Sequence, residues 1–482
     1  MSRIAMINPP FVPRFIRSAR WQARGRGRTL YYPIWLSYAT ALLELDHKVR
    51  LIDAPATNQN PKAILEDLKT FKPDLIVVDS GFPSLRNDVD FGMTCKRSFP
   101  EAKLAMVGPP VAQFSEFIMK SGVDFAALHE YEQTLKDLIE TISAGETYDK
   151  VNGIYFRKNG EIRFSKPREY PEEFLNRIPF VSSVYSRHLD IRNYALGHTR
   201  YPMVQLFTSR GCPFNCSFCS WPANFTGRKV RYRSISNVIE EFRFVEEEMP
   251  SVKEIFIEDD TFTLSKKRIA ELCHSIKEED ITINWSCNSR ADLCIDTMRI
   301  MKSAGCRLLD VGFESGNQNV LSLARKGLAP DQMMTFGRNV RESNLLLLAD
   351  FVIGLEGESE ESIRQTQRFI RKLKPHLLQV SIATPIPGTL FHERMRLLGY
   401  MVETEAESTL DQGGYQKAVI SLPNLSARDL EAKVDETLRK YYLSPAYLAR
   451  VSEMVIRKGG PDEIPTILKS AIEFIRYAGR RR

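Results

Sequence analysis

Short apolar runs alternate with helix-like segments along most of this chain, and that alternation limits the folds open to it more than any other feature. Between residues 1 and 149, each run is short enough for one buried strand, and segments such as Ala63–Phe71 between the runs have helical periodicity. Strands that alternate with helices predict a parallel sheet with helices on both faces. The predicted strands are Arg3–Asn8, Lys48–Asp53, Asp74–Asp79, Lys103–Gly108 and Val123–Leu128.

A second strand–helix series begins near Pro202, and an apolar stripe with helical spacing follows its first strand. The stripe consists of Ile235, Val238, Ile239, Phe242 and Val245. Six consecutive units of this kind predict a partial parallel (β/α)6 barrel, in which ligands meet the carboxyl ends of the strands. The predicted strands are Pro202–Thr208, Glu254–Asp259, Ile281–Ser286, Leu308–Glu314, Leu346–Gly354 and Leu377–Ala383.

The predicted fold class is α/β, and the chain divides into four parts. Residues 1–149 form a doubly wound parallel sheet, and residues 202–399 form the partial barrel. Residues 150–201 are predicted to be a hairpin and linker, because two turn signals with alternating apolar residues in Val151–Phe164 indicate a hairpin, and a proline-rich segment follows. Residues 400–482 are predicted to be a helical C-terminal region.

A mild excess of positive charge is concentrated in two segments of the chain. The 482 residues include 67 basic and 60 acidic ones, a formal net charge of +7, with clusters at Arg14–Arg28 and Gly479–Arg482. Because Arg14–Arg28 lies in a long loop between the first strand and the first helix, we expect a lid over a cofactor cleft and no nucleic-acid contact. The final segment, Ile464–Arg482, is expected either to pack on the barrel or to contact a membrane surface.

The sequence also bears on the cellular compartment. It has no apolar segment of the kind that directs secretion and no run of about 18 apolar residues, so we expect neither a signal peptide nor a transmembrane helix. Eight cysteines among 482 residues are too few for a disulfide-stabilised scaffold. A reducing cytoplasm is therefore the expected location.

Three cysteines, Cys212, Cys216 and Cys219, lie close together directly after the first predicted barrel strand. Three thiolates on a short loop can hold three irons of a [4Fe–4S] cluster and leave the fourth iron for a small chelating ligand. The alternative is a zinc site completed by a distant cysteine, Cys287 or Cys294. Outside the triplet, the cysteines suit buried positions as small apolar residues.

The order of these features resembles the radical S-adenosylmethionine superfamily, in the subgroup with an N-terminal cobalamin-binding domain. Beyond the C-x3-C-x2-C loop, the likeness is carried by the segments IEDDTFT, NWSCNSRAD, VGFESGNQNVL, DFVIGLEGESEES and ATPIPGTLFHE, which lie at successive strand ends. Within that subgroup, YYPIWLSYATALLE, LIDAPA and CSFCSWPANFTGRKVRYRS look most like enzymes of hopanoid lipid biosynthesis. The resemblance covers nearly the whole chain.

The resemblance implies roles for residues in these motifs, and it assigns the cysteine triplet to the cluster. The residues implied for S-adenosylmethionine binding are Glu314, Ser315, Arg290, Gly354 and Gly357. The two glycines also suit turns that need positive φ, which is the alternative for them. Asp259 and Asp260 are expected either to line the substrate cavity or, for Asp260, to cap the next helix.

For the N-terminal sheet, the resemblance implies a cobalamin site at the carboxyl ends of the strands. The residues implied are Asp79, Ser80, Gly81, Ser84, Gly108, Pro109 and Glu130. Many such domains carry a D-x-H-x-x-G segment after the first strand, but NPPFVPRF stands there, and neither His47 nor His129 lies in that motif. We therefore expect cobalt without a histidine ligand. Other members of the superfamily keep the domain and lose the cofactor, which is the alternative.

The activity implied is radical chemistry at an unactivated carbon of a small molecule, lipid-like or another secondary metabolite. One electron from the cluster would cleave S-adenosylmethionine to methionine and a 5′-deoxyadenosyl radical, which removes a hydrogen atom, and C-methylation with cobalamin would follow. Without cobalamin, the outcome would be reduction, ring opening, cyclisation or carbon–carbon coupling. An electron donor such as flavodoxin or ferredoxin is implied, and a non-catalytic iron–sulfur protein is the remaining alternative.

Overall fold

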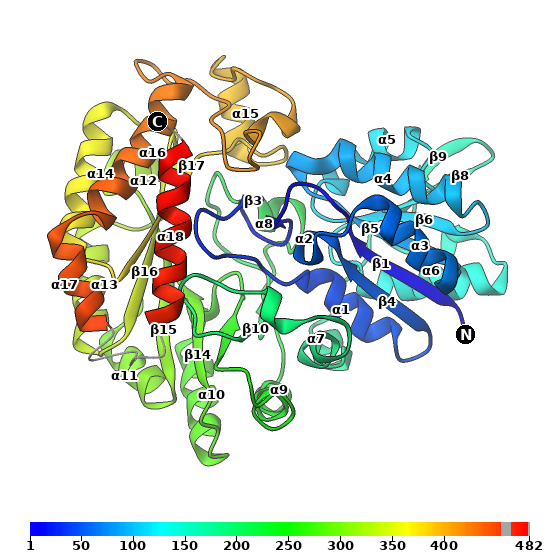
Figure 1. The fold of residues 1–482 in the computed structure, drawn as a ribbon, viewed down its shortest axis with the longest axis horizontal. Helices are drawn as coiled ribbons and strands as arrows, with labels where there is room; N and C mark the ends of the chain where they lie inside the picture. The colour runs from blue at the N-terminus through cyan, green and yellow to red at the C-terminus, as the bar shows by residue number, and fades with distance from the viewer. Residues whose placement is uncertain (455–463, 481–482) are drawn as a thin grey trace.

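The computed structural model describes residues 1–454 and 464–480, and the N-terminal part is a sheet with helices on both faces (Figure 1). Parallel strands form its centre in the order β4-β1-β5-β6-β7, which is the 2-1-3-4-5 order of one doubly wound fold. This order confirms the predicted N-terminal fold. The strands are β1 (Arg3–Asn8), β4 (Lys48–Asp53), β5 (Leu75–Asp79), β6 (Lys103–Val107) and β7 (Phe125–Ala127).

The helices that cover this sheet are α1 (Ile34–Leu43), α3 (Pro61–Phe71), α4 (Leu85–Ser98), α5 (Val111–Lys120) and α6 (Glu132–Ala144). Successive residues of a strand point to opposite faces, so the sheet serves two cores. Ala5 and Ile7 pack with apolar residues of α3, α4 and α5. Ile4 and Met6 belong to a larger core with α1 and α6, and that core continues into the barrel.

A hairpin extends the N-terminal sheet beyond β7. Its strands are β8 (Ile154–Lys158) and β9 (Glu161–Phe164), and β8 pairs antiparallel with β7, with Tyr155 opposite Ala126. The hairpin is therefore part of the sheet and not of a linker. Its pairing provides hydrogen-bond partners for the backbone groups of β7 that would otherwise lie at an open sheet edge. Helix α7 (Val181–His188) follows and lies beside α1.

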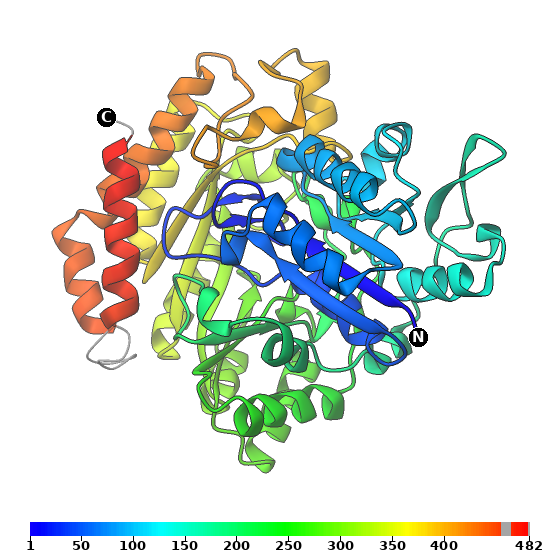
Figure 2. The ribbon, with the colours of Figure 1, turned by 45° about the vertical axis from the view of Figure 1, so that its right-hand side comes forward.

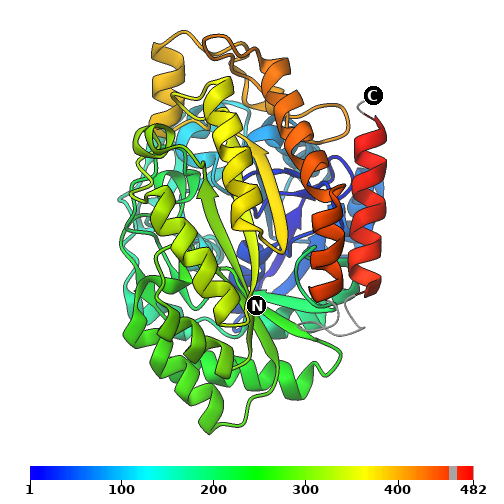
Figure 3. The same cartoon turned by 90° about the vertical axis from the view of Figure 1, so that its left-hand side faces the viewer.

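Parallel strands in sequential order form the second sheet, which confirms the predicted partial barrel, and helices cover its outer face (Figure 3). One strand differs from its predicted bounds: β14 covers Asn284–Ser289 and not Ile281–Ser286. The shift arises because polar residues beyond the apolar run pair with both neighbouring strands. The strands are β10 (Met203–Leu206), β13 (Glu254–Ile257), β14 (Asn284–Ser289), β15 (Cys306–Glu314), β16 (Leu346–Ile353) and β17 (Leu377–Ile382). The outer helices are α9 (Ile235–Glu248), α10 (Lys266–Glu278), α11 (Ile295–Ser303), α13 (Pro330–Glu342) and α14 (Glu360–Leu373).

The C-terminal region is helical, as predicted, but its helices begin later than expected. Most of residues 400–425 are irregular, with isolated bridges such as Met401 to Ile420. The helices that follow lie along the side of the barrel formed by β16 and β17 (Figure 3). They are α16 (Ala427–Tyr442), α17 (Pro445–Glu453) and α18 (Ile464–Arg480).

Helix α18 packs on this region through Tyr477, whose side chain is buried and whose hydroxyl donates to Asp435 Oδ1 at 2.8 Å. Ile472 and Ile475 of the same helix are exposed. Within residues 1–454 and 464–480, no helix has the length and apolar character needed to cross a membrane. The last arginines of the basic tail, 481 and 482, lie outside the described residues.

Gly108, at the end of β6, provides a test of the strand-end geometry. It has a φ of +106°, and a Cβ atom there would lie 2.4 Å from the carbonyl oxygen of Ser80. We expect Gly108→Ala to lower the free energy of unfolding by about 1–3 kcal/mol through steric overlap, measured by thermal melting. Gly145→Ala is the control, because Gly145 has a φ of +64° and no atom within 4 Å. Equal losses in both variants would contradict the steric explanation.

Candidate functional site

Asp259 fixes the start of the cysteine loop, where the chain leaves β10. Its carboxylate accepts hydrogen bonds from the N–H and hydroxyl groups of Thr208 and Ser209, at 2.6–3.0 Å. Burial raises the pKa of Asp259, although these donors favour the ionised form. Asp260 accepts a hydrogen bond from the N–H of Gly211 at 2.9 Å. It does not cap α10, because the N-cap residue of that helix is a serine. Both carboxylates therefore shape the loop.

Gly211 turns the chain from strand β11 (Ser209–Arg210) into the cysteine loop. β11 pairs antiparallel with β12 (Arg231–Tyr232), which closes the loop at its base. Gly211 has a φ of +92°, and a Cβ atom there would lie 2.2 Å from the carbonyl oxygen of Lys229. Glycine is therefore required at this turn.

The predicted cluster ligands lie on the loop that follows. Cys212 N–H donates to the carbonyl oxygen of Gly227 at 3.3 Å, and its Sγ lies 3.7 Å from Thr261 Oγ1. Cys219 N–H donates to the carbonyl oxygen of Cys216 at 3.3 Å. Among the described residues, no three His, Cys, Asp or Glu side chains converge as a preformed metal site. Backbone hydrogen bonds thus hold the loop, and its three thiols are free to bind a metal.

Two cations lie beside the thiols. Burial raises the pKa of Cys216, and the nearby ammonium of Lys326 acts in the opposite direction. Burial also raises the pKa of Cys219 to about 12, although the nearby guanidinium of Arg20 acts to lower it. Because thiolates are the form that binds iron, these cations and the metal itself would favour the ionised donors.

The two cysteines considered as a fourth zinc ligand, Cys287 and Cys294, lie beside residues outside the cysteine loop. Cys287 is buried in β14 beside Cys306, and burial raises its pKa well above the usual value. Cys294 is only half-buried, which differs from the expected core position, and its Sγ lies 3.2 Å from Thr297 Oγ1. The donor set on the loop is therefore three thiols, which fits a cluster with one open iron better than a zinc site with four protein ligands.

Glu314, Lys326 and Arg290 form a charged cluster beside Cys216. Glu314 Oε1 lies 2.7 Å from Lys326 Nζ, and their side chains are 9% and 10% exposed. Arg290 donates to the carbonyl oxygen of Lys326, and its guanidinium lies 3.9 Å from the centre of the Phe214 ring. Glu314 has a φ of +64°, which is strained for a residue with a side chain. The structure thus brings the predicted Glu314 and Arg290 together and adds Lys326, which has no motif in the sequence.

Ser315, Gly354 and Gly357 lie in the turns that follow β15 and β16. Ser315 Oγ lies 3.1 Å from Thr366 Oγ1 of α14. Gly354 and Gly357 have φ values of +102° and +78°, and a Cβ atom at Gly357 would lie 2.4 Å from Leu323 Cδ1. Positive φ is a sufficient reason for both glycines, and their contact with S-adenosylmethionine stays a prediction.

The basic arm, Arg14–Arg28, crosses from the N-terminal sheet to the cysteine loop, in front of the barrel strands in Figure 2. Arg17 forms a buried ion pair with Asp88 at 2.6 Å. Trp21 stacks on Phe218 of the cysteine loop, with 6.2 Å between the ring centres. The arm therefore covers the loop at the place where a lid over the cofactor cleft is predicted.

Most residues predicted for cobalamin gather at one edge of the N-terminal sheet. The N–H of Gly81 and the hydroxyl of Ser84 donate to Asp88 at 3.1 and 2.6 Å, which fixes the turn after β5. Burial raises the pKa of Asp79 to about 7. The residues at this edge are Asp79, Ser80, Gly81, Ser84, Gly108 and Pro109.

A cleft lies between this edge, the end of the barrel and the irregular C-terminal segment. Phe82 and Pro83 line it from the N-terminal sheet, Thr384–Pro387 and His392 line it from the barrel, and Trp21 lines it from the arm. Apolar rings with a few polar groups are typical of cofactor and substrate clefts. The sequence prediction did not include the C-terminal wall of this cleft, and it gave no role to His392, which lies in the segment ATPIPGTLFHE.

Glu130 lies in a buried ion network that joins the two parts of the chain. Arg210 Nη1 lies 2.8 Å from Glu130 and 2.7 Å from Glu132, and Arg231 also pairs with Glu130. Burial opposes the ionisation of Glu130, but the two arginines lower its pKa. The guanidinium of Arg210 also lies 4.6 Å from the Trp35 ring. This position favours a structural role for Glu130 over the predicted cobalamin contact.

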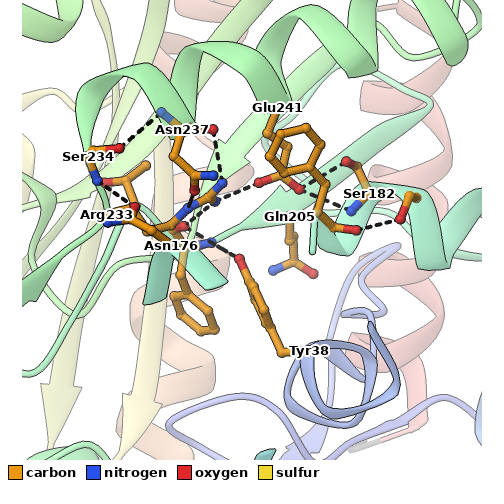
Figure 4. A network of polar contacts seen from close by, with 12 residues as sticks. Tyr38, Asn176, Ser182, Gln205, Arg233, Ser234, Asn237 and Glu241 are labelled. Atoms are coloured by element: carbon orange, nitrogen blue, oxygen red, sulfur yellow. Dashed lines mark hydrogen bonds and ion pairs between the residues drawn. The ribbon is translucent and has the colours of Figure 1, made fainter. Parts of the chain in front are cut away.

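A second buried network ties helices to the start of the cysteine loop (Figure 4). Arg233 donates to Glu241 at 2.6 Å and to the carbonyl oxygen of Phe207 at 2.9 Å. Ser182 of α7 donates to the same glutamate through its N–H and its hydroxyl. The hydroxyl of Tyr38, in α1, accepts from the N–H of Phe207 at 2.9 Å. Helices α1, α7 and α9 therefore meet at one end of the loop.

Residues 206–370 match the family model described as the Radical SAM superfamily. The matched residues begin at the end of β10, include the cysteine triplet and the charged cluster, and end in α14. The strand order and the strand-end cysteine loop are those the resemblance implied. This match confirms the resemblance to the radical SAM superfamily over residues 206–370.

Relatives and solved structures extend the similarity over most of the chain. An uncharacterized methyltransferase of Pyrococcus horikoshii is 29% identical over 87% of this chain and 89% of its own. The hopanoid C-3 methylase of Methylococcus capsulatus is 25% identical over 73% of this chain and 66% of its own. The radical S-adenosylmethionine methyltransferase TsrM of Kitasatospora setae has a TM-score of 0.72 and 15% identity over 100% of both chains, which shows the same fold.

The Glu130 network gives a prediction about stability. Glu130→Ala would leave Arg210 and Arg231 buried with less compensation, so we expect a loss of about 3–5 kcal/mol, measured as a lower thermal midpoint. Glu66→Ala is the control, because Glu66 pairs with Lys69 on the surface and its loss should leave the midpoint unchanged. Similar midpoints for both variants would contradict the role of the network.

Proposed function

We propose that this chain is a cobalamin-dependent radical S-adenosylmethionine methyltransferase that acts on an unactivated carbon of a small molecule, lipid-like or another secondary metabolite. The observation that carries the proposal is the loop with free thiols and flanking cations at the carboxyl end of the first barrel strand. The names of the relatives support methyl transfer, and one solved complex of TsrM holds cobalamin and a [4Fe–4S] cluster.

The chain supplies the groups that would bind and shield the cofactors. When bound, the cluster and S-adenosylmethionine supply one-electron cleavage of the carbon–sulfur bond, and cobalamin supplies the methyl group. Lys326 and Glu314 present opposite charges beside the loop, so they suit the carboxylate and amino groups of S-adenosylmethionine. Phe218 and Trp21 would keep water from the loop. The cluster ligands would be Cys212, Cys216 and Cys219.

The cleft lined by Phe82 and Pro83 would take cobalamin, since it borders the strand ends where ligands of doubly wound folds bind. Two histidines of the N-terminal part have other partners. His47 Nδ1 accepts the N–H of Ser2 at 3.4 Å, next to the start of β4, and His129 Nδ1 lies 3.2 Å from a backbone carbonyl oxygen. We therefore propose a cobalt without a histidine from the N-terminal domain.

A cobalamin-independent radical reaction, such as reduction, ring opening, cyclisation or carbon–carbon coupling, is the second candidate. It rests on NPPFVPRF, which stands where the histidine motif of many cobalamin domains lies. A non-catalytic iron–sulfur protein would have no use for the charged cluster of Glu314, Lys326 and Arg290, so that alternative has less support.

The partners follow from the chemistry proposed. A reductant such as flavodoxin or ferredoxin would supply the electron, and the reducing cytoplasm would preserve the thiols. The exposed Ile472 and Ile475 of α18 would be the place for a peripheral membrane contact if the substrate is a lipid. We propose no nucleic-acid partner for the arm, whose Arg17 and Trp21 make internal contacts.

Iron content tests the cluster assignment. Anaerobically reconstituted protein should hold about four irons per chain, and replacing Cys212, Cys216 and Cys219 together by alanine should abolish them. Cys95→Ala and Cys273→Ala are controls that remove buried thiols from helices, and they should keep the iron. Full iron retention in the triple variant would refute the assignment.

Cobalt content tests the choice between the two candidate functions. Protein prepared with excess cobalamin should contain cobalt, and its Co(II) form should show no axial nitrogen splitting in electron paramagnetic resonance. A splitting that disappears in His47→Ala or His129→Ala would refute the histidine-free site. A preparation without cobalt would favour the cobalamin-independent reaction.

A further inference from the structure

A row of polar side chains crosses the barrel sheet near the carboxyl ends of its strands. Asp310 of β15 pairs in register with Asn288 of β14, and Asp350 of β16 pairs with Gly312. Glu258 continues the row just beyond β13, where Gln205 Nε2 of β10 donates to its Oε2 at 2.8 Å. We call this set the polar row, and it consists of Gln205, Glu258, Asn288, Asp310 and Asp350.

The polar row faces the inside of the half-barrel. Phe351, next to Asp350 on β16, contacts Phe369 of the outer helix α14, and successive side chains of a strand point to opposite faces. Asn288, Asp310 and Asp350 are partly exposed, whereas the residues on either side of each are buried. Solvent therefore reaches these three side chains from inside the half-barrel.

The polar row holds more acidic than basic side chains. Asp310 and Asp350 lie on the neighbouring strands β15 and β16, and Glu258 follows β13. Arg20 of the arm is a cation beside this set, 3.7 Å from Glu258. Burial raises the pKa of Glu258 to about 7 and that of Asp310 to about 6, and burial with repulsion from Asp310 raises that of Asp350. Arg20 is shared with Asp260, so one guanidinium faces several carboxyl groups.

Two buried polar atoms at the row have no hydrogen-bond partner within the described part of the chain, Asp350 Oδ1 and His198 Nε2. The His198 side chain is 10% exposed, and its Nε2 lies 4.0 Å from Asp310 Oδ2, beyond hydrogen-bond range. Burial lowers the pKa of His198 to about 3, so its imidazole is neutral and does not offset the carboxyl charges. Folded chains rarely leave such atoms unpaired unless a ligand or water completes them.

We infer that the polar row binds a protonated amine of the substrate, with Asp350 and Asp310 as its carboxylate acceptors. This inference rests on the proposed function and adds a chemical feature of its substrate. An ammonium group carries three donors and a positive charge, so it would pair with Asp350 Oδ1 and offset the repulsion among the carboxyl groups. The hydroxyl of Tyr31 lies near the same carboxyl groups, and its pKa is raised by burial and by their charges.

The inference narrows the substrate class. A purely apolar lipid would leave Asp350 Oδ1 and His198 Nε2 without partners, and it would also leave the carboxyl charges uncompensated. A substrate with an amine on one side and an unactivated carbon elsewhere would satisfy the row and still present that carbon to the radical. The polar row therefore favours an amine-bearing metabolite.

Asp350→Asn tests the inference, because it keeps the shape of the side chain and removes its ability to ionise beside a cation. The sample is anaerobically reconstituted full-length protein, and the probe is n-propylammonium chloride, with n-propanol and propionate as matched probes without a positive charge. Ligand-observed proton NMR should show binding of n-propylammonium, and Asp350→Asn should weaken it about tenfold. Asp310→Asn should show a similar loss, whereas Asp331→Asn, on the exposed face of α13, should leave binding unchanged.

Three results would overturn the inference. The first is equal binding of the three probes, and the second is equal binding of n-propylammonium to the natural chain and Asp350→Asn. The third is a lower thermal midpoint for Asp350→Asn, because a ligand site with repelling carboxyl groups should keep or gain stability when one charge is removed. A lower midpoint would indicate that Asp350 has a structural role.

S-adenosylmethionine is itself a cation, so its binding is measured on the same samples by equilibrium dialysis. If Asp350→Asn weakens S-adenosylmethionine to the same extent as n-propylammonium, the polar row belongs to the cofactor site and the inference fails. Iron content and 5′-deoxyadenosine formation report separately on the proposed function. Their absence from the natural chain would refute that function, whereas their presence without discrimination among the probes would refute the amine site alone.

Discussion

Arg210 carries the interaction on which the arrangement of the two domains depends. Its guanidinium is buried between Glu130 and Glu132 of the N-terminal part, and it lies two residues before Cys212. A buried cation without partners is costly, whereas carboxylates at hydrogen-bond distance make its burial tolerable. The cysteine loop is therefore held by the N-terminal sheet as well as by the barrel, and neither domain positions the cluster ligands alone.

The basic arm adds a second connection between the same two parts. It leaves β1, is anchored by the Arg17–Asp88 ion pair, and places Trp21 on Phe218 of the cysteine loop. Helix α1, which is buried along its whole length, fills the space between the sheet and the barrel behind it. Together these segments shield the loop with protein atoms, which suits one-electron chemistry that water would quench.

Two features of the barrel interior carry an energetic cost, and both lie close to the proposed chemistry. Glu314 has a positive φ, and burial inside the barrel raises the pKa values of Asp310 and Asp350. Asp259 differs from them, because its carboxylate finds all of its hydrogen bonds within the chain. Unfavourable local arrangements persist in proteins mainly where function requires them. Asp259 is therefore a structural carboxylate, whereas Asp310 and Asp350 are candidate binding groups.

The sequence by itself determined the two sheets and the cysteine triplet, because each depends on residues that are neighbours in the chain. β1 and β4 have their predicted bounds. The tertiary structure decided that the β8–β9 hairpin joins the sheet, that Glu130 pairs with Arg210, 80 residues away, and that Lys326 pairs with Glu314. Strand register and domain docking create these contacts, and neither leaves a pattern in the local sequence.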